Sequence, residues 1–372
     1  MHCDAVIVGA GPGGSAAALL LAQAGWSVSL IEKTDFPRRK VCGEFISAAT
    51  MPVLKVCGVA GSFVAAAGPP VTRIGVYAGS AMLRAPREQV WGRALGREHL
   101  DMLLRNAAVA AGANLIQPAE VTAVERQDGA FFCELDDGRK LAARIVIAAC
   151  GSWNTKGIFA LPSPRLRSSD LFAFKAHFIN GRLPPGLMPL LAFPGGYGGM
   201  VESDGGRLSL SCCIRRDALA KVRRRHGGKA ADAVLAHILE TTWGARLALE
   251  NADLEGRFLS TGPIHPGIRA RHDDGIFFTG NIAGEAHPVI AEGISMAIQS
   301  SGLLAKLLIA DRAGRYARAW TRRFAPRIHI AALAAQLAMH TPTRAASLAL
   351  LRAVPGLLGL GARLSGKTPI SV

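Results

Sequence analysis

The sequence predicts an α/β protein of two interleaved domains, one built on a parallel sheet and one on an antiparallel sheet, followed by a C-terminal helical segment. A β-branched run, a glycine-rich turn and a small-residue helix pattern open the chain. Alternating apolar runs fill its middle, and basic residues recur at helical spacing near its end. With 372 residues, 50% of them hydrophobic and 19% charged, the chain can bury a large core, which excludes a disordered protein or a short adaptor.

The N-terminal pattern is the most specific in the chain. Residues 5–8 form an apolar, β-branched strand pattern, residues 9–14 a glycine-rich turn, and residues 15–25 a small-residue helix pattern. The run 28–31 is a second strand that ends at Glu32. This order and spacing match the Rossmann-like dinucleotide-binding fingerprint.

Each residue type in this pattern has a physical reason. Gly9 permits the tight turn, Gly11 lets the backbone approach a pyrophosphate, and Gly14 lets the helix pack closely on the strand. The helix N-terminus then offers free N–H donors to the phosphates. Glu32 accepts hydrogen bonds from ribose hydroxyls and would repel a 2′-phosphate, so we expect FAD or NAD rather than NADP. A glycine-rich loop in an unrelated α/β protein is the alternative interpretation.

Later segments resemble a known family. They are Arg38-Arg39-Lys40-Val41-Cys42-Gly43-Glu44, the Arg97-x-x-Leu100-Asp101 helix, and Gly280-Asn281-Ile282-Ala283-Gly284 with Pro288 and Glu292-Gly293. Over about the first 310 residues, their order resembles the geranylgeranyl reductase branch of the p-hydroxybenzoate hydroxylase-type FAD-dependent oxidoreductases and monooxygenases. The resemblance implies FAD as the cofactor and NAD(P)H as a transient reductant.

The resemblance also implies which residues bind the cofactor. They are Gly9, Gly11, Gly14 and Glu32 for the ADP half, Lys33, Arg39, Lys40 and Arg97 for the ribose and phosphates, Gly280 and Asn281 for the ribityl chain and pyrophosphate, and Gly293 and Ile294, at a helix N-terminus, for the flavin ring. Asn281 stands where the family usually has Asp, and Cys150 where its monooxygenases usually have Asp before a glycine. Weaker FAD binding and less efficient use of NADPH are therefore expected. The WxWxIP motif of flavin halogenases is absent, so we do not expect halogenation.

Candidate catalytic residues come from the same segments. Cys42 would line the substrate cavity, or be a small buried residue. Glu44 would orient substrate or shuttle a proton, or be an ordinary surface or capping carboxylate. His287 would act as an acid or base near neutral pH, or form a structural hydrogen bond. Glu292 would become a useful acid if burial without a partner raised its pKa.

The order of the motifs predicts a discontinuous domain arrangement. The predicted FAD-binding domain consists of residues 1–75, 96–160 and 262–310, the substrate domain of residues 76–95 and 161–261, and the C-terminal segment of residues 311–372. Three strand patterns separated by turn residues predict a β-meander in the FAD-binding domain, at residues 121–126, 131–135 and 141–149.

The substrate domain contains an aromatic-Pro-Gly segment that resembles one in the reductase branch. We expect its Phe193 and Tyr197 at the substrate pocket, and the alternative is a glycine-rich hairpin with a core Phe. The 7 cysteines show neither CxxC pairs nor Cys/His ligand spacing, so we expect neither a disulfide framework nor a metal site.

The C-terminal segment is strongly basic. Residues 311–372 contain ten Lys or Arg and one acid, and so carry +9 of the net charge of +16. The pattern predicts cationic amphipathic helices, which would lie on an anionic membrane surface or cover the substrate sheet. We find no apolar run long enough for a membrane span, no secretory signal and no nucleic-acid motif. We therefore expect a cytoplasmic protein, peripheral on the inner face of the membrane, that binds no nucleic acid.

Three functions fit these observations. The leading hypothesis is an FAD-dependent monooxygenase or hydroxylase that uses NAD(P)H and O2 on a hydrophobic, aromatic or polyketide-like substrate. The alternative is a reductase of polyprenyl carbon–carbon double bonds, which the Cys42 motif and the basic C-terminal segment favour. A non-catalytic flavin-binding scaffold is the third. The fold alone does not choose among them.

Overall fold

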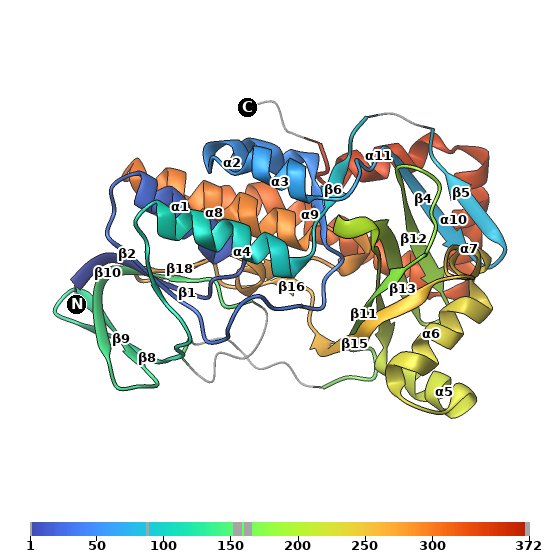
Figure 1. Cartoon of the computed structure of the whole chain (residues 1–372), viewed down its shortest axis with the longest axis horizontal. Coiled ribbons are helices and arrows are strands. Elements are labelled where there is room, and N and C mark those ends of the chain that lie inside the picture. Colours follow the sequence, from blue (N-terminus) through green and yellow to red (C-terminus); the bar gives the residue numbers. More distant parts are fainter. Residues whose placement is uncertain (1, 87–88, 152–157, 160–165, 369–372) are drawn as a thin grey trace.

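The computed structural model describes residues 2–86, 89–151, 158–159 and 166–368. They form two sheet domains that lie next to each other along the long axis of the molecule, with helices above the first sheet and around the second (Figure 1). The predicted α/β class with two domains is confirmed. The predicted domain boundary at residues 160–161 lies outside the described residues.

The first domain is built on an 8-stranded sheet. The strands of its main path are β1 His2–Val8, β2 Val28–Ile31, β7 Asn114–Ile116, β10 Lys140–Ala148, β17 His272–Asp273 and β18 Ile276–Phe278. Their order is β17-β18-β10-β1-β2-β7, and β1 pairs in parallel with both β10 and β2. Ala5, Val6 and Ile7 in the central strand are fully buried. A continuous apolar run is typical of a parallel strand covered on both faces.

The predicted β-meander is present. Strands β8 Val121–Gln127 and β9 Ala130–Leu135 pair antiparallel with each other, and β9 pairs antiparallel with β10. Asp128 and Gly129, at the first bend, have φ values of 51° and 84°. These left-handed conformations suit the Asp-Gly turn that the sequence contains.

Three helices pack over one face of the parallel sheet (Figure 1). They are α1 Pro12–Gln23, α4 Arg97–Ala110 and α8 Gly293–Ile309, and the shorter helices α2 Met51–Val56 and α3 Ala60–Ala66 lie beyond them. A side chain at Gly14 would overlap the carbonyl oxygen of Gly9, so only glycine permits the close approach of α1 to its strand.

The second domain contains a 7-stranded sheet with the order β15-β11-β14-β13-β12-β4-β5. These strands are β4 Arg73–Ala78, β5 Ala81–Arg84, β11 Leu171–Ile179, β12 Leu187–Phe193, β13 Gly196–Glu202, β14 Leu208–Arg215 and β15 Asp253–Ile264. All neighbours are antiparallel except β4 and β12. The predicted antiparallel sheet therefore contains one parallel pair, because the chain passes through the first domain between these two strands.

Helices cover the outer face of the second sheet. They are α5 Arg216–His226, α6 Ala230–Thr241 and α7 Trp243–Ala248. In β11, Phe174, Ala176 and Phe178 belong to the core against these helices. Because side chains alternate along a strand, Lys175 and His177 face the opposite side, toward the first domain.

The C-terminal segment consists of α9 Tyr316–Met339, α10 Thr341–Ala353 and α11 Gly356–Leu364. Tyr316, Trp320 and Phe324 of α9 are buried in the core of the first domain. Leu358 of α11 packs with strands of the second sheet. Among the described residues no single helix is long and apolar enough to span a membrane, and α10 and α11 meet that test only as a pair bent by 113°. The remaining strands form two short pairs, β3 Phe45–Ser47 with β6 Gly92–Ala94 and β16 Gly267–Ile268 with β19 Gly284–Glu285.

Candidate active site

The turn between β1 and α1 forms the nucleotide end of the site. No side chain caps α1, so its first N–H groups remain available as donors. A Cβ at Gly11 would meet only the Nη2 atom of Arg97, at 3.7 Å, whereas a Cβ at Gly9 would lie 2.8 Å from the carbonyl oxygen of Ala149. The turn thus leaves open space in front of the helix N-terminus, which fits a diphosphate group.

Glu32 lies at the end of β2 and is held in place by its neighbours. Its Oε2 atom accepts a hydrogen bond from the Ala10 N–H at 3.0 Å, and Arg38 binds both carboxylate oxygens at 2.9 and 3.0 Å. Thr34 donates its N–H and its hydroxyl to Oε1. For Glu32 to bind ribose hydroxyls, they must replace some of these donors.

A cluster of basic side chains faces the same turn. The Nε and Nη2 atoms of Arg97 each lie 2.7 Å from the Asp101 carboxylate. Burial alone would lower the pKa of Arg97, but Asp101 raises it above its ordinary value. Lys40 has no ion-pair partner among the described residues, and burial together with the charges of Arg38 and Arg97 lowers its pKa. An anion would relieve this repulsion, so the cluster fits a diphosphate.

Two basic residues implied by the resemblance lie elsewhere. Lys33 is 58% exposed and lies 3.6 Å from Glu120. Arg39 points into the second domain, where its Nη2 atom is 2.7 Å from Nδ1 of His177. The neighbouring Arg38, rather than Arg39, binds the Glu32 carboxylate.

A cavity between the two domains adjoins the N-terminus of α8. It contains about 1130 Å³ of space, its open mouth included. Of the residues implied for the flavin, Asn281, Gly293 and Ile294 line it, and Gly280 is adjacent with φ of 69°. Most of the wall is apolar, with Val41, Phe45, Met188, Leu190, Met200, Val201, Ile264, Val289 and Ile294 among its lining residues.

Cys42 and Asn281 are both held by polar neighbours in this cavity. The sulfur of Cys42 accepts a hydrogen bond from the Glu44 N–H at 3.4 Å and also interacts with the Arg97 guanidinium. The side-chain amide of Asn281 donates to Glu285 at 3.0 Å. Cys42 therefore lies between the basic cluster and the cavity.

Glu44 is the most constrained residue of the cavity wall. It is fully buried with φ of 61°, a conformation that is unfavourable for a residue with a side chain. Its carboxylate pairs with Lys175, and its Oε2 atom is 2.8 Å from Nε2 of His177. Burial opposes the charge, but His177 and Lys175 outweigh it and lower the pKa of Glu44 to about 2. Glu44 thus stays ionised at neutral pH, which fits a structural anion rather than a proton shuttle.

Lys175 and His177 did not emerge from the sequence as candidate residues. Their signal is two polar residues spaced by two within an otherwise apolar strand. Such a spacing places both on one face, opposite the core. The identity of their partner, Glu44, depends on the tertiary fold.

Tyr197 and His287 form a neutral pair at the cavity. The Tyr197 hydroxyl is 3.2 Å from Nδ1 of His287. Burial raises the pKa of Tyr197 well above its ordinary value and lowers that of His287 to about 4. At neutral pH the phenol is therefore protonated and the imidazole is uncharged. Tyr197 lines the cavity, and His287 lies behind it.

Phe193 and Glu292 occupy other environments than those expected. Phe193 is buried in the core beneath α6, edge to face with His237, and is not among the described residues that line the cavity. Strand alternation explains this, because Phe193 points to the helix-covered face.

Glu292 is buried but has partners, with its oxygens 3.0 Å from Ser47 Oγ and 2.9 Å from Lys367 Nζ. Burial raises its pKa, although Lys367 opposes the shift.

The comparison with known families agrees with the nucleotide end. Residues 2–157 match the family model described as an FAD binding domain. The match covers less than half of the chain and indicates an FAD-binding domain at its N-terminus. The glycine turn, the open helix N-terminus and Lys40, which has no ion-pair partner among the described residues, all fit FAD.

Two similar proteins align with most of the length of this chain. It is 24% identical over 345 residues to a menaquinone reductase of Mycolicibacterium smegmatis, covering 86% of this chain and 79% of that one. It is 25% identical over 324 residues to digeranylgeranylglycerophospholipid reductase 1 of Methanopyrus kandleri, covering 80% and 78% of the two chains. The structure of the flavin-dependent brominase Bmp2 matches with a TM-score of 0.80 at 21% identity, covering 99% and 94%. The last match shows a shared fold, and together these findings confirm the family resemblance.

Proposed function

We propose that this oxidoreductase reduces carbon–carbon double bonds of a polyprenyl chain, with NAD(P)H as the source of electrons. The observation that carries the proposal is the cavity. Its wall is mainly apolar, and its two lining carboxylates, Glu44 and Glu285, are each paired with basic side chains. Such a cavity suits a long hydrocarbon better than a charged substrate. Two proteins of similar sequence that align with most of the chain are named as reductases. The name of one of them refers to a digeranylgeranyl glycerophospholipid.

Saturation of one double bond requires two electrons and two protons, which NAD(P)H and one proton from water supply together. When bound, FAD supplies the two-electron redox chemistry. The N-terminus of α8 at Gly293 lines the cavity, so its N–H groups and dipole favour negative charge at this position. The chain must also exclude water and hold a proton for the alkene carbon.

We assign the proton donor to the hydroxyl of Tyr197. It lines the cavity and stays protonated at neutral pH because burial raises its pKa. Nδ1 of His287 lies 3.2 Å from the phenol oxygen; with the hydrogen on Nδ1, the imidazole donates to that oxygen and leaves the Tyr197 O–H free to point at the alkene. A donor placed in this way typically accelerates a reaction by about 10²–10⁴-fold. Tyr197→Phe should therefore lower turnover about 100-fold or more while FAD remains bound.

The monooxygenase that ranked first from the sequence is the second candidate. The observation that favours it is the Tyr197 hydroxyl at the cavity with the uncharged His287 behind it, because this pair can pass a proton from a phenolic substrate to the imidazole. Ser211, Thr261 and Asn281 are further polar residues of the cavity wall that would orient such a substrate.

Product analysis tests these functions directly. FAD-loaded protein is incubated with NADPH or NADH, oxygen and a geranylgeranyl glycerolipid. The masses of the products are then measured by mass spectrometry. The proposal expects a gain of two hydrogen atoms per reduced bond. A gain of one oxygen atom on this lipid or on an aromatic panel would establish the monooxygenase instead. FAD binding without any NAD(P)H oxidation would indicate the non-catalytic flavin-binding scaffold.

We also propose that α10 and α11 attach the protein to an anionic membrane surface. Leu350, Val354, Leu360 and Leu364 are exposed, while Leu358 of α11 belongs to a hydrophobic cluster against which Leu190, a residue of the cavity wall, also packs. Arg344, Arg352 and Arg363 on the same helices add positive charge. The exposed apolar residues thus lie close to a cavity that suits a lipid.

Vesicle sedimentation of the full chain tests this attachment. The double variant Leu360→Glu, Leu364→Glu should lose binding to anionic vesicles, because charged groups replace the apolar face. Val109→Glu, at a similarly exposed position of α4, is the matched control. Equal sedimentation of wild type and double variant would refute the attachment.

A further inference from the structure

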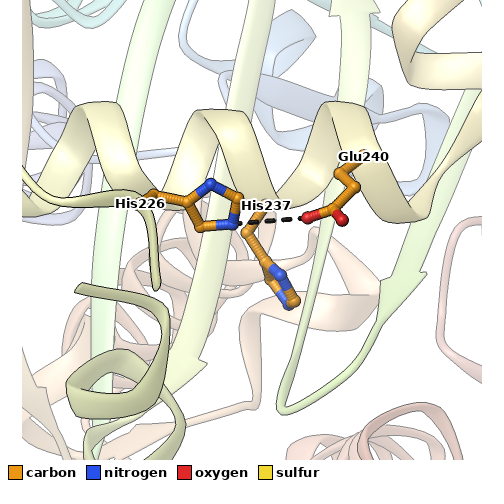
Figure 2. Close-up of side chains that lie close together, drawn as sticks. All are labelled: His226, His237 and Glu240. Carbon is orange, nitrogen blue, oxygen red and sulfur yellow. Dashed lines mark ion pairs between the residues drawn. The ribbon is translucent and has the colours of Figure 1, made fainter. Parts of the chain in front are cut away.

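A cluster of two histidines and one glutamate lies on the outer face of the second domain. His226 is the last residue of α5, and His237 and Glu240 lie one turn apart on α6. Gly227 and Gly228, each with φ of 69°, let the chain reverse between the helices. Figure 2 shows the His226 ring facing the Glu240 carboxylate, with the His237 ring below and between them.

The three side chains bring possible ligand atoms together. One such atom from each residue lies within 4.8 Å of the other two. Nε2 of His226 is 3.4 Å from Oε2 of Glu240, the ion pair drawn in Figure 2. None of the three residues is among the described residues that line the cavity, so the cluster is separate from the active site.

The hydrogen bonding of His237 leaves a lone pair free. Its Nε2 atom is 3.0 Å from the Pro194 carbonyl oxygen, which only accepts, so Nε2 must carry the hydrogen. Nδ1 is then the unprotonated nitrogen, and it is buried without a hydrogen-bond partner among the residues that the structure describes. Nε2 of His226 faces the Glu240 carboxylate at 3.4 Å but makes no hydrogen bond within the described part of the chain. Buried nitrogens of this kind are rare unless something satisfies them.

We propose that His226, His237 and Glu240 bind one Zn²⁺ ion, with water as the fourth ligand. Two imidazole nitrogens and one carboxylate are a donor set that zinc prefers, and the Pro194 carbonyl plays the part of the outer-shell acceptor that orients a ligating histidine. Burial lowers the pKa of His237, which keeps the ring in the neutral form that binds metal. Tetrahedral coordination needs donor atoms about 3.3 Å apart, and a rotation of Glu240, whose side chain is 43% exposed, closes the gap.

Metal binding at this site would replace a surface ion pair. The Glu240 carboxylate pairs with Arg225, whose side chain is 65% exposed. Such a pair contributes little to stability, so its loss opposes zinc only weakly. The ion would join α5 to α6 and, through His237, to the turn at Pro194 that precedes β13 and its Tyr197.

Direct metal analysis of tag-free full-length protein tests the proposal. The protein is equilibrated with Zn²⁺, dialysed and analysed by mass spectrometry for bound metal, and its affinity is measured against a chromophoric chelator. We expect one Zn²⁺ per chain. His226→Gln and Glu240→Gln should each lower the affinity by more than about 100-fold, beyond the roughly 10–100-fold effect of losing an outer-shell partner. His329→Gln and Glu250→Gln, at exposed positions elsewhere, are the matched controls and should bind as wild type.

A second readout separates loss of a ligand from loss of the fold. Zn²⁺ should raise the Tm of wild type and of both controls but not of the two site variants. Co²⁺ in place of Zn²⁺ should give the visible bands of a tetrahedral ion only where all three ligands are present. Absence of bound metal in folded wild type, or equal binding by folded site variants, would overturn the proposal.

Discussion

At the nucleotide end, the site is built from backbone that is contiguous in sequence, whereas the cavity end is built from side chains that meet only in the folded chain. Residues 5–32 supply the turn, the helix N-terminus and Glu32. Glu44 and Lys175, by contrast, are 131 residues apart. The charges differ as well, because Lys40 lacks an ion-pair partner among the described residues while Glu44 is doubly paired. The unpaired cation indicates where a charged ligand binds, and the paired carboxylate indicates a wall that an apolar ligand touches.

The largest expected effect comes from changing the backbone turn at the nucleotide end. Gly14→Ala places a Cβ onto the carbonyl oxygen of Gly9, so α1 must shift away from the turn. We expect complete loss of FAD binding, measured from the flavin absorbance of the purified protein. Gly61→Ala in α3 is the control, because a Cβ there meets nothing within 4 Å. Retention of stoichiometric FAD by Gly14→Ala would contradict the close-approach argument.

The next effect concerns a paired charge. Lys367→Ala leaves Glu292 buried without its cation, and removal of one partner from a buried pair typically destabilises a protein by about 3 kcal/mol or more. Chemical denaturation measures the free energy of unfolding, with Lys306→Ala at an exposed position as control. The double variant Glu292→Gln, Lys367→Ala should recover part of the loss. If Lys367→Ala is as stable as the control, the pair has no such role.

A smaller effect compares two lysines that the family resemblance assigns to the cofactor. Lys40→Ala should weaken FAD binding by about 10-fold or more, as expected for a charge-assisted contact worth about 1.5–3 kcal/mol. Lys33→Ala should leave it unchanged, since Lys33 is exposed and pairs with Glu120. Titration of apoprotein with FAD at two salt concentrations provides the measurement. The reverse ranking would show that the unpaired cation does not indicate the phosphate position.

The smallest effect is a pH dependence of stability. Burial lowers the pKa of His287 from 6.5 to about 4, so between these values the unfolded chain binds a proton that the folded chain does not. Stability should therefore fall as the pH drops from 6.5 to 4, with His287 contributing about 2 kcal/mol or less after allowance for its partial exposure. His287→Gln should flatten this fall in denaturation series at several pH values, and exposed His329→Gln should not. An identical slope in His287→Gln would mean that His287 is solvated.

The elements that the sequence predicts well are those with local causes. The fingerprint of residues 5–32 and the meander follow from turn residues and strand periodicity, and both are present. Phe193 shows the limit of such reasoning. The alternation of side chains along a strand predicts which residues share a face, but not which face borders the cavity. Arg39 and Glu292 illustrate a second limit. Their partners, His177 and Lys367, lie on distant segments, and no local pattern encodes those contacts.

The proposed zinc site illustrates the same limit in another way. His226 and His237 are eleven positions apart, a spacing without a known motif, so the sequence predicted no metal. Only the reversal at Gly227 and Gly228 brings α5 and α6 together. Tertiary structure, not spacing, groups these ligands.

The most direct test of the central claim is anaerobic flavin reoxidation. Enzyme reduced by NADPH is mixed, without oxygen, with a geranylgeranyl glycerolipid that carries no quinone, since a quinone would accept electrons by itself. The proposal predicts return of the oxidised flavin absorbance and a saturated product, at a rate that falls about 100-fold in Tyr197→Phe. Flavin that stays reduced with the lipid, yet reoxidises with O2 and transfers an oxygen atom to an aromatic substrate, would contradict it.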